Sequence, residues 1–121
     1  DRGNVAISYP SDYVGMDGRV AAVDPAIRGR ELTLPELIET GQPEYPELAR
    51  QARLTGRVVL QFVISRSGEV EDVAIVRVDK PNIGFEAAAV AALRQWRYEP
   101  AKIGYTPVDV YATAVVDFTL H

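Results

Sequence analysis

In two stretches of the C-terminal half of the chain every second residue is apolar, which is the period of a strand with one buried face. This alternation covers residues 57–65 and 108–120, and residues 70–78 form a β-branched run between them. The predicted inward positions are Val58, Leu60, Phe62 and Ile64, then Val73 and Ile75, then Val108, Val110, Ala112, Ala114, Val116, Phe118 and Leu120. Turn residues at 66–69 join the first two runs, so the pattern predicts a hairpin followed by a third strand.

Two helices are predicted around these strands. Pro46 suits the first turn of a helix that runs to Leu54, because its missing N–H would be unpaired there, and Gly56 can end it. Asn82 or Gly84 can open a second helix. Its apolar face contains Phe85, Ala88, Ala89, Ala92, Leu93 and Trp96, and Pro100 blocks its continuation. The predicted fold is α+β: a three-stranded antiparallel sheet with two helices on one face.

Residues 1–40 differ in character from residues 41–121, because glycine and proline break their apolar residues into short pieces. Residues 5–9 and 20–23 are predicted to be short strands. The spacing of Thr33 and Glu36 is that of a capping box, and Gly41 is a suitable C-terminal cap. We therefore predict a helix over 34–40, in a partly structured extension (1–40) that precedes one compact domain (41–121).

The outward face of the predicted sheet is less polar than a solvated face. The outward positions include Val59, Val63, Ala74, Val76, Val78, Tyr111 and Val115. A large exposed apolar face is unusual for a monomer. We expect the N-terminal extension or a second copy of the chain to cover it.

The composition argues against catalysis, metals and cofactors. The 121-residue chain has no cysteine, which excludes disulfides, thiol catalysis and thiolate metal sites, and its only histidine is the last residue, His121. Glu69, Glu71 and Asp72 lie beside a turn without further spaced ligands, so a solvated hairpin end is the better interpretation. No glycine-rich phosphate loop occurs. We predict no enzyme, no cofactor and no metal site.

Trp96 lies between Arg94 and Arg97, and an aromatic residue beside arginines can stack on nucleic-acid bases. However, Trp96 has helical spacing with Leu93, and the formal net charge is −4. Both facts favour a core position for Trp96 and argue against nucleic acid as a partner. In this interpretation the tryptophan fills the gap below the last helical turn, and Tyr98 and Pro100 then turn the chain into the third strand.

Several runs resemble the TonB C-terminal domain family. They cover residues 41–121, in order and at the family's spacing. These runs are Gln42-Pro43-Glu44-Tyr45-Pro46, Gly56-Arg57-Val58, Ser67-Gly68-Glu69-Val70, Lys80-Pro81-Asn82 through Phe85-Glu86, and Leu93-Arg94-Gln95-Trp96-Arg97-Tyr98-Glu99-Pro100. The resemblance implies structural roles for Tyr45, Pro46, Gly56, Gly68, Phe85, Trp96, Tyr98 and Pro100.

The resemblance also implies a function. Such domains are periplasmic, belong to inner-membrane-anchored energy transducers, and grasp the TonB box, a short extended segment of outer-membrane active transporters. The box would add a strand beside the exposed third strand, so that backbone hydrogen bonds supply much of the affinity. The candidate partner-binding residues are Gln42, Pro43, Val108, Val110, Tyr111, Ala112, Thr113, Ala114, Val116 and Phe118. The alternative is an interaction or structural domain of another periplasmic or signalling protein with a different partner.

Residues 1–40 depart from the family's pattern, because they are neither proline-dense nor striped with charge. We therefore expect part of this extension to pack on the sheet. If it lies along Val108–Phe118, the domain is blocked by its own chain or forms a homodimer by strand exchange. No apolar run is long enough to span a membrane. The membrane anchor and the contacts with inner-membrane proton-channel proteins are thus expected upstream of Asp1.

Overall fold

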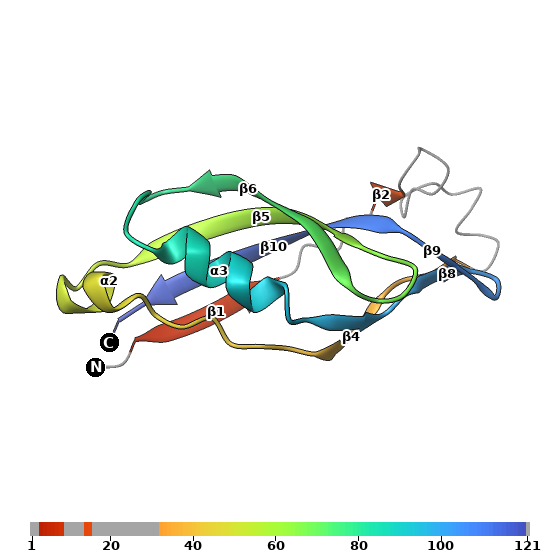
Figure 1. Ribbon diagram of the computed structural model, residues 1–121, viewed down its shortest axis with the longest axis horizontal. Helices are drawn as coiled ribbons and strands as arrows, with labels where there is room; N and C mark the ends of the chain where they lie inside the picture. The colour runs from red at the N-terminus through yellow and green to blue at the C-terminus, as the bar shows by residue number, and fades with distance from the viewer. Residues whose placement is uncertain (1–2, 9–13, 16–31, 121) are drawn as a thin grey trace.

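A twisted antiparallel sheet forms the centre of the molecule. The structure is a computed structural model, and it describes residues 3–8, 14–15 and 32–120. The strand order of the sheet is β1-β10-β5-β6, and β2 also pairs with β10. The five strands are β1 (Asn4–Ser8), β2 (Val14–Gly15), β5 (Gly56–Ile64), β6 (Val70–Val78) and β10 (Val110–Thr119). The strands follow the long axis of the molecule, and both ends of the chain lie at the same end of it (Figure 1).

The nine-residue ladder between β5 and β10 carries the core. It runs without a register shift from the pair Val110 and Ile64 to the pair Phe118 and Gly56. The inward side chains of these strands are almost completely buried: Val58, Leu60, Phe62, Ile64, Val110, Ala112, Ala114, Val116 and Phe118. The alternation in the sequence therefore predicted these two faces correctly.

Two helices lie on one side of this sheet, as predicted. The longer one, α3 (Phe85–Leu93), crosses the sheet, and the short α2 (Glu47–Gln51) lies near one end of it (Figure 1). Gly84 caps α3 with a left-handed backbone. The buried residues of α3 are Phe85, Ala89, Ala92 and Leu93. No helix among the described residues is long and apolar enough to cross a membrane.

Trp96 follows α3 and is fully buried. Its indole Nε1–H donates a hydrogen bond to the Gly41 carbonyl oxygen at 3.0 Å, and its ring meets that of Phe62 edge-on, with centroids 6.5 Å apart. A large ring packed against β5 thus also fixes the start of the segment before α2. The indole N–H is satisfied by a backbone acceptor, which is the usual requirement for a buried tryptophan.

Two smaller sheets extend the fold and correct the sequence analysis. One contains β3 (Leu32–Thr33), β8 (Ala101–Ile103) and β9 (Thr106–Val108), and the other contains β4 (Glu36–Glu39) and β7 (Arg97–Glu99). The helix predicted over 34–40 is therefore wrong. Leu37 pairs with Tyr98 of β7. The backbone of this segment is therefore paired with a distant strand, although the local capping pattern favours a helix. The region around Tyr98 is likewise a strand and not only a turn.

The hairpin partner β6 departs from simple alternation. Ile75, predicted to be a core residue, is 38% exposed, Val73 is only half-buried, and the buried residue of β6 is Val70. The β5–β6 register shifts at two places, and Asp72 has a positive φ of 51°. These irregularities are bulges, which re-aim the side chains beyond them.

Two other strand predictions have different outcomes. The strand predicted at 5–9 exists as β1, whereas the one predicted at 20–23 lies outside the described residues. The predicted third strand is divided, because Val108 belongs to β9 and pairs with Ala101 of β8. Val108 is thus not on β10, which begins two residues later.

Candidate functional site

The candidate partner edge lies along β10, and the chain's own N-terminal strands pair with it. Residues 4–8 of β1 run antiparallel to residues 115–119 of β10, from the pair Asn4 and Thr119 to the pair Ser8 and Val115. The two residues of β2 pair with Val110 and Tyr111. The expectation that β10 is an exposed edge is therefore wrong, and the alternative that the extension lies on it describes the structure.

Side chains on β1 divide by face. Val5 and Ile7 point to the helix side, where they are half-buried and pack against the core. Asn4 and Ala6 are exposed on the other side. One side chain–backbone hydrogen bond accompanies the ladder, from Thr119 Oγ1 to the Asn4 carbonyl oxygen at 3.5 Å. The strand thus adds two aliphatic side chains to the core and leaves its other face to solvent.

The candidate residues on β10 also divide by face. Val110, Ala112, Ala114, Val116 and Phe118 are buried in the core, so they can offer a partner only their backbone groups. Tyr111 and Thr113 alternate with them and face outward, and the Tyr111 side chain is 38% exposed. A strand beside β10 would thus meet backbone donors and acceptors together with the outward side chains.

Tyr45 connects the segment before α2 to the end of β10. Its ring packs edge-on against Phe85 and against Phe118, with centroid distances of 5.9 and 5.6 Å. Its hydroxyl donates a hydrogen bond to the Leu54 carbonyl oxygen. Gly3 of the extension approaches the same ring so closely, with φ +79°, that a Cβ at position 3 would overlap it. Tyr45 therefore marks the place where the extension, α3 and β10 meet.

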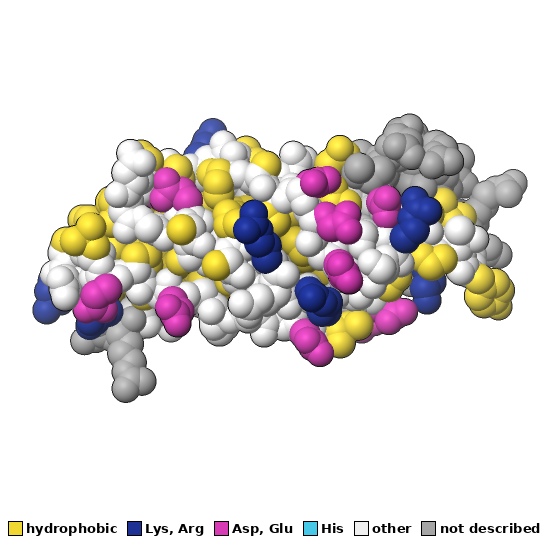
Figure 2. Space-filling model, in the orientation of Figure 1, with side chains coloured by type: hydrophobic (Ala, Val, Ile, Leu, Met, Phe, Trp, Pro, Cys, Tyr) yellow, Lys and Arg dark blue, Asp and Glu magenta, His cyan; other side chains and the backbone are white. Residues whose placement is uncertain are grey.

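Gln42 and Pro43 belong to a neighbouring hollow. They line a cavity of about 600 Å³ that lies between α3 and the segment preceding α2. Ala88 and Ala92 of α3 line the same cavity. Gln42 is exposed and Pro43 is buried. On the face shown in Figure 2, apolar side chains gather at the end of the molecule that holds α2 and α3, whereas acidic side chains gather over β6. The candidate site residues thus fall in two places, the β10 ladder and this hollow, and Tyr45 joins them.

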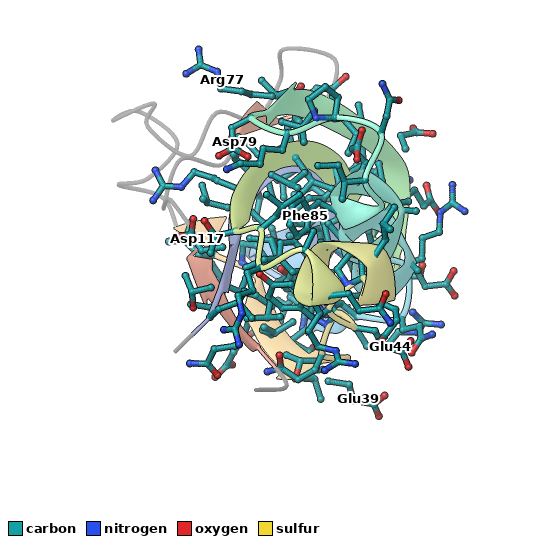
Figure 3. All side chains as sticks on the ribbon, turned by 90° about the vertical axis from the view of Figure 1, so that its left-hand side faces the viewer. Glu39, Glu44, Arg77, Asp79, Phe85 and Asp117 are labelled. Carbon is teal, nitrogen blue, oxygen red and sulfur yellow. The ribbon has the colours of Figure 1, made fainter. Side chains whose placement is uncertain are left out.

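A charged cluster on the outer side of β10 was missed in the sequence analysis. Asp117 accepts a hydrogen bond from Arg57 Nε at 2.6 Å, and this hydrogen bond, followed by the charge of Asp117, raises the pKa of Arg57. Asp79, which accepts a hydrogen bond from the Arg57 amide, lies on the same side of the molecule, opposite Glu44 (Figure 3). The available signal was Asp117, one of two acidic residues in the largely apolar run 108–120. Within the described part of the chain, no acidic or histidine cluster is suited to a metal ion.

The tyrosine at this junction gives a pH-dependent prediction. Burial raises the pKa of Tyr45, so its contribution to stability is complete below the unfolded pKa of about 10 and is lost as the pH rises through the higher folded pKa. We expect Tyr45→Phe to lower the free energy of unfolding by about 1 kcal/mol at pH 8, through loss of the hydrogen bond to Leu54. The difference between the two proteins should shrink above pH 10.

Urea unfolding at pH 8 and pH 10.5 measures this difference. Tyr105, whose side chain is fully exposed, provides the control, and Tyr105→Phe should leave the free energy of unfolding unchanged at both pH values. A difference between wild type and Tyr45→Phe that stays constant or grows above pH 10 would contradict the assignment.

Comparison with known proteins identifies relatives of residues 41–120, which match the family model described as Gram-negative bacterial TonB protein C-terminal. Protein TonB of Salmonella typhimurium is 39% identical over 72 residues, which are 60% of this chain and 29% of that protein. Protein TonB of Escherichia coli K12 is 37% identical over 70 residues, which are 58% and 29% of the two chains. The chain thus spans less than a third of the curated relatives it matches.

The fold has a solved counterpart. The solution NMR structure of the Pseudomonas aeruginosa TonB CTD superposes with a TM-score of 0.63 at 26% sequence identity. The match covers 72% of this chain and 87% of that one.

Proposed function

This chain belongs to the family of Gram-negative bacterial TonB C-terminal domains, and from that premise we propose that it is the periplasmic binding domain of a TonB-like energy transducer. Its partners are TonB-dependent outer-membrane transporters, each engaged through its TonB box. The full-length protein is anchored in the inner membrane. There it takes up force from proton-channel proteins through a segment outside residues 1–121.

The observation that carries this proposal is the strand pairing on the edge of β10 that faces away from β5. This edge holds a five-residue extended strand in a regular ladder, so its backbone groups accept strand addition. Gln42 and Pro43 lie in the adjacent hollow, and Tyr45 links that hollow to Phe118. A partner segment on β10 therefore has backbone contacts along the strand and a second group of side-chain contacts beside it.

This mode of binding requires no catalytic residues, and membership of the family is consistent with a non-enzymatic role. Each backbone hydrogen bond contributes only about 0.5–1.5 kcal/mol net, so a short strand gives modest affinity. Additional apolar contacts set the preference for one partner sequence over another.

The test is binding of synthetic TonB-box peptides from outer-membrane transporters, followed by nitrogen–proton NMR. We expect shifts on residues 110–119 and around Gln42 and Tyr45. N-methylation of single peptide amides separates strand addition from other modes, because alternate amides of an added strand face β10. Methylation at those positions should weaken binding at least about tenfold, since it removes a donor and adds a clash, and methylation at the intervening positions should have little effect.

Equal effects at all methylated positions would contradict strand addition. Shifts confined to the hollow around Gln42 would place the site there instead. Absence of binding by any box peptide, with the edge shown to be open, would favour the alternative partner of a periplasmic or signalling domain.

A further inference from the structure

The partner edge on β10 is occupied in this structure by the chain itself. Residues 4–8 of β1 use the backbone groups of residues 115–119 that an added strand would need. Gly3 touches Tyr45, which joins this edge to the hollow of Gln42 and Pro43. An external strand and β1 cannot occupy the same ladder at one time.

We propose that β1 is an internal occupant of this site, which must leave before an external strand can pair with β10. This inference concerns the regulation of the site and rests on the proposed function. It also describes the kind of strand that the site takes. Gly3, Val5 and Ile7 fall on one face of the extension, beside Tyr45 and against the core. The geometry thus selects a small residue followed by two aliphatic residues at alternate positions.

The contacts of β1 show why it leaves β10 more readily than β5, the strand on the other side of β10. The neighbouring strand β5 is held by nine paired positions and contributes four fully buried inward side chains. In contrast, β1 has five paired positions, and its two inward side chains are only half-buried. Its outward residues Asn4 and Ala6 are exposed. Loss of β1 therefore exposes much less apolar surface than loss of any part of β5.

The expected effect on affinity follows from population arithmetic. When only a fraction of molecules has an open edge, the apparent dissociation constant is the intrinsic one divided by that fraction. Minor conformations of proteins are commonly populated at about 0.1–10%. Opening the edge permanently should therefore tighten peptide binding by about tenfold or more.

A reversible lock tests the proposal directly. The chain has no cysteine, so Ala6→Cys combined with Asp117→Cys introduces a single disulfide between two directly paired positions in the middle of the β1 ladder. We expect the oxidised protein to lose binding of the TonB-box peptide at the β10 edge, and reduction to restore it. Asp117→Cys alone is the control for loss of the contact with Arg57.

One further variant weakens β1 without a crosslink, and a second variant is its control. Val5→Ser combined with Ile7→Ser removes its core contacts, and we expect this variant to bind the peptide at least about tenfold more tightly than wild type. Asn4→Ser combined with Ala6→Ser changes the exposed face of the same strand and should leave affinity unchanged. Nitrogen–proton spectra check that each variant keeps the fold of residues 41–120.

The second probe is a capped peptide copy of residues 3–8. On the Val5→Ser, Ile7→Ser variant it should compete with the box peptide for the same amides of β10. A copy with serine in place of valine and isoleucine should bind less tightly, which tests the preference for alternate aliphatic residues.

The outcomes separate this inference from the proposed function. Equal box-peptide affinity in the oxidised and reduced lock overturns the inference and leaves the proposed function standing. Binding of the peptide copy without binding of any box peptide supports an exchangeable edge and overturns the proposed partner. Failure of both peptides on the weakened variant overturns both.

Discussion

Replacement of Trp96 by alanine is expected to lower the free energy of unfolding by about 3–5 kcal/mol, the usual range for truncating a fully buried large aromatic. The substitution leaves a cavity between α3 and β5, where the ring now meets Phe62. It also removes the hydrogen-bond donor to the carbonyl oxygen of Gly41, the residue just before Gln42 and Pro43. The start of the segment that lines the hollow then loses this anchor. Folded domains are stable by only about 5–15 kcal/mol, so this single change removes a large share of the total.

Urea unfolding monitored by circular dichroism measures the loss in unfolding free energy. Tryptophan fluorescence cannot be used, because the variant lacks the one tryptophan of the chain. Trp96→Phe is the matched control, because it keeps a ring beside Phe62 and removes only the indole N–H and part of the volume. We expect it to lose about 2 kcal/mol. A Trp96→Ala variant within about 1 kcal/mol of wild type would show that the ring does not carry this part of the core.

The second large effect is expected at Gly68, in the turn between β5 and β6. Its φ is +85°, and a Cβ there would overlap the backbone carbonyl oxygen of Tyr98. The same glycine donates its amide to the Ser65 carbonyl oxygen and accepts from the Tyr98 amide, each at 2.8 Å. Gly68→Ala therefore combines left-handed strain with a clash against backbone that cannot rotate away, and we expect a loss of about 2–5 kcal/mol.

Gly84→Ala separates the two causes. Gly84 also has a positive φ, but a Cβ there would meet only the Pro46 side chain, at 3.1 Å. Its loss, about 1–2 kcal/mol, reports backbone strain with little overlap. Thermal unfolding of the two variants side by side makes the comparison. An equal loss at both positions would mean that the approach of Tyr98 to the turn adds nothing.

Sequence patterns predicted the elements whose stability is local or whose burial is periodic. Val58 to Ile64 and Val110 to Phe118 alternate because each strand has one face in the core, and this signal does not depend on knowing the partner strand. Gly84 and Pro46 mark helix starts through properties of their own backbones. Such features can be recognised from a few neighbouring residues.

Elements that depend on distant pairing were not predictable in this way. Residues 33–36 carry a helix-capping pattern, yet residues 36–39 form β4 because β7 offers them a ladder. Ile75 pairs with the buried Leu60 yet is 38% exposed, on a strand whose register with β5 shifts at two places, and such bulges have no strong sequence signal. For β4 the deciding contact lies about 60 residues away in the chain, and for Ile75 it lies in the register of the partner strand.

The candidate site shows the same division. The backbone of β10 was the predicted partner surface, but Val108 belongs to another strand, and the contribution of Asp117 and Gly3 to this region appears only in three dimensions. The sequence predicts a short N-terminal strand, and it allows this strand either to lie on β10 or to leave that edge open. The choice between them depends on a pairing across nearly the whole chain.

That pairing has a consequence for the order of folding. Asn4 and Thr119 are 115 positions apart in the chain, so joining them closes the longest loop in the described fold. Contacts of such separation form late, because their loop-closure entropy is met only after nearer contacts exist. We expect β5, β6, α3 and β10 to assemble first and β1 to dock in a slower final phase. Until that phase is complete, a crowded refolding mixture allows β1 of one molecule to dock on another, so dilute refolding should favour monomers and concentrated refolding should trap swapped dimers.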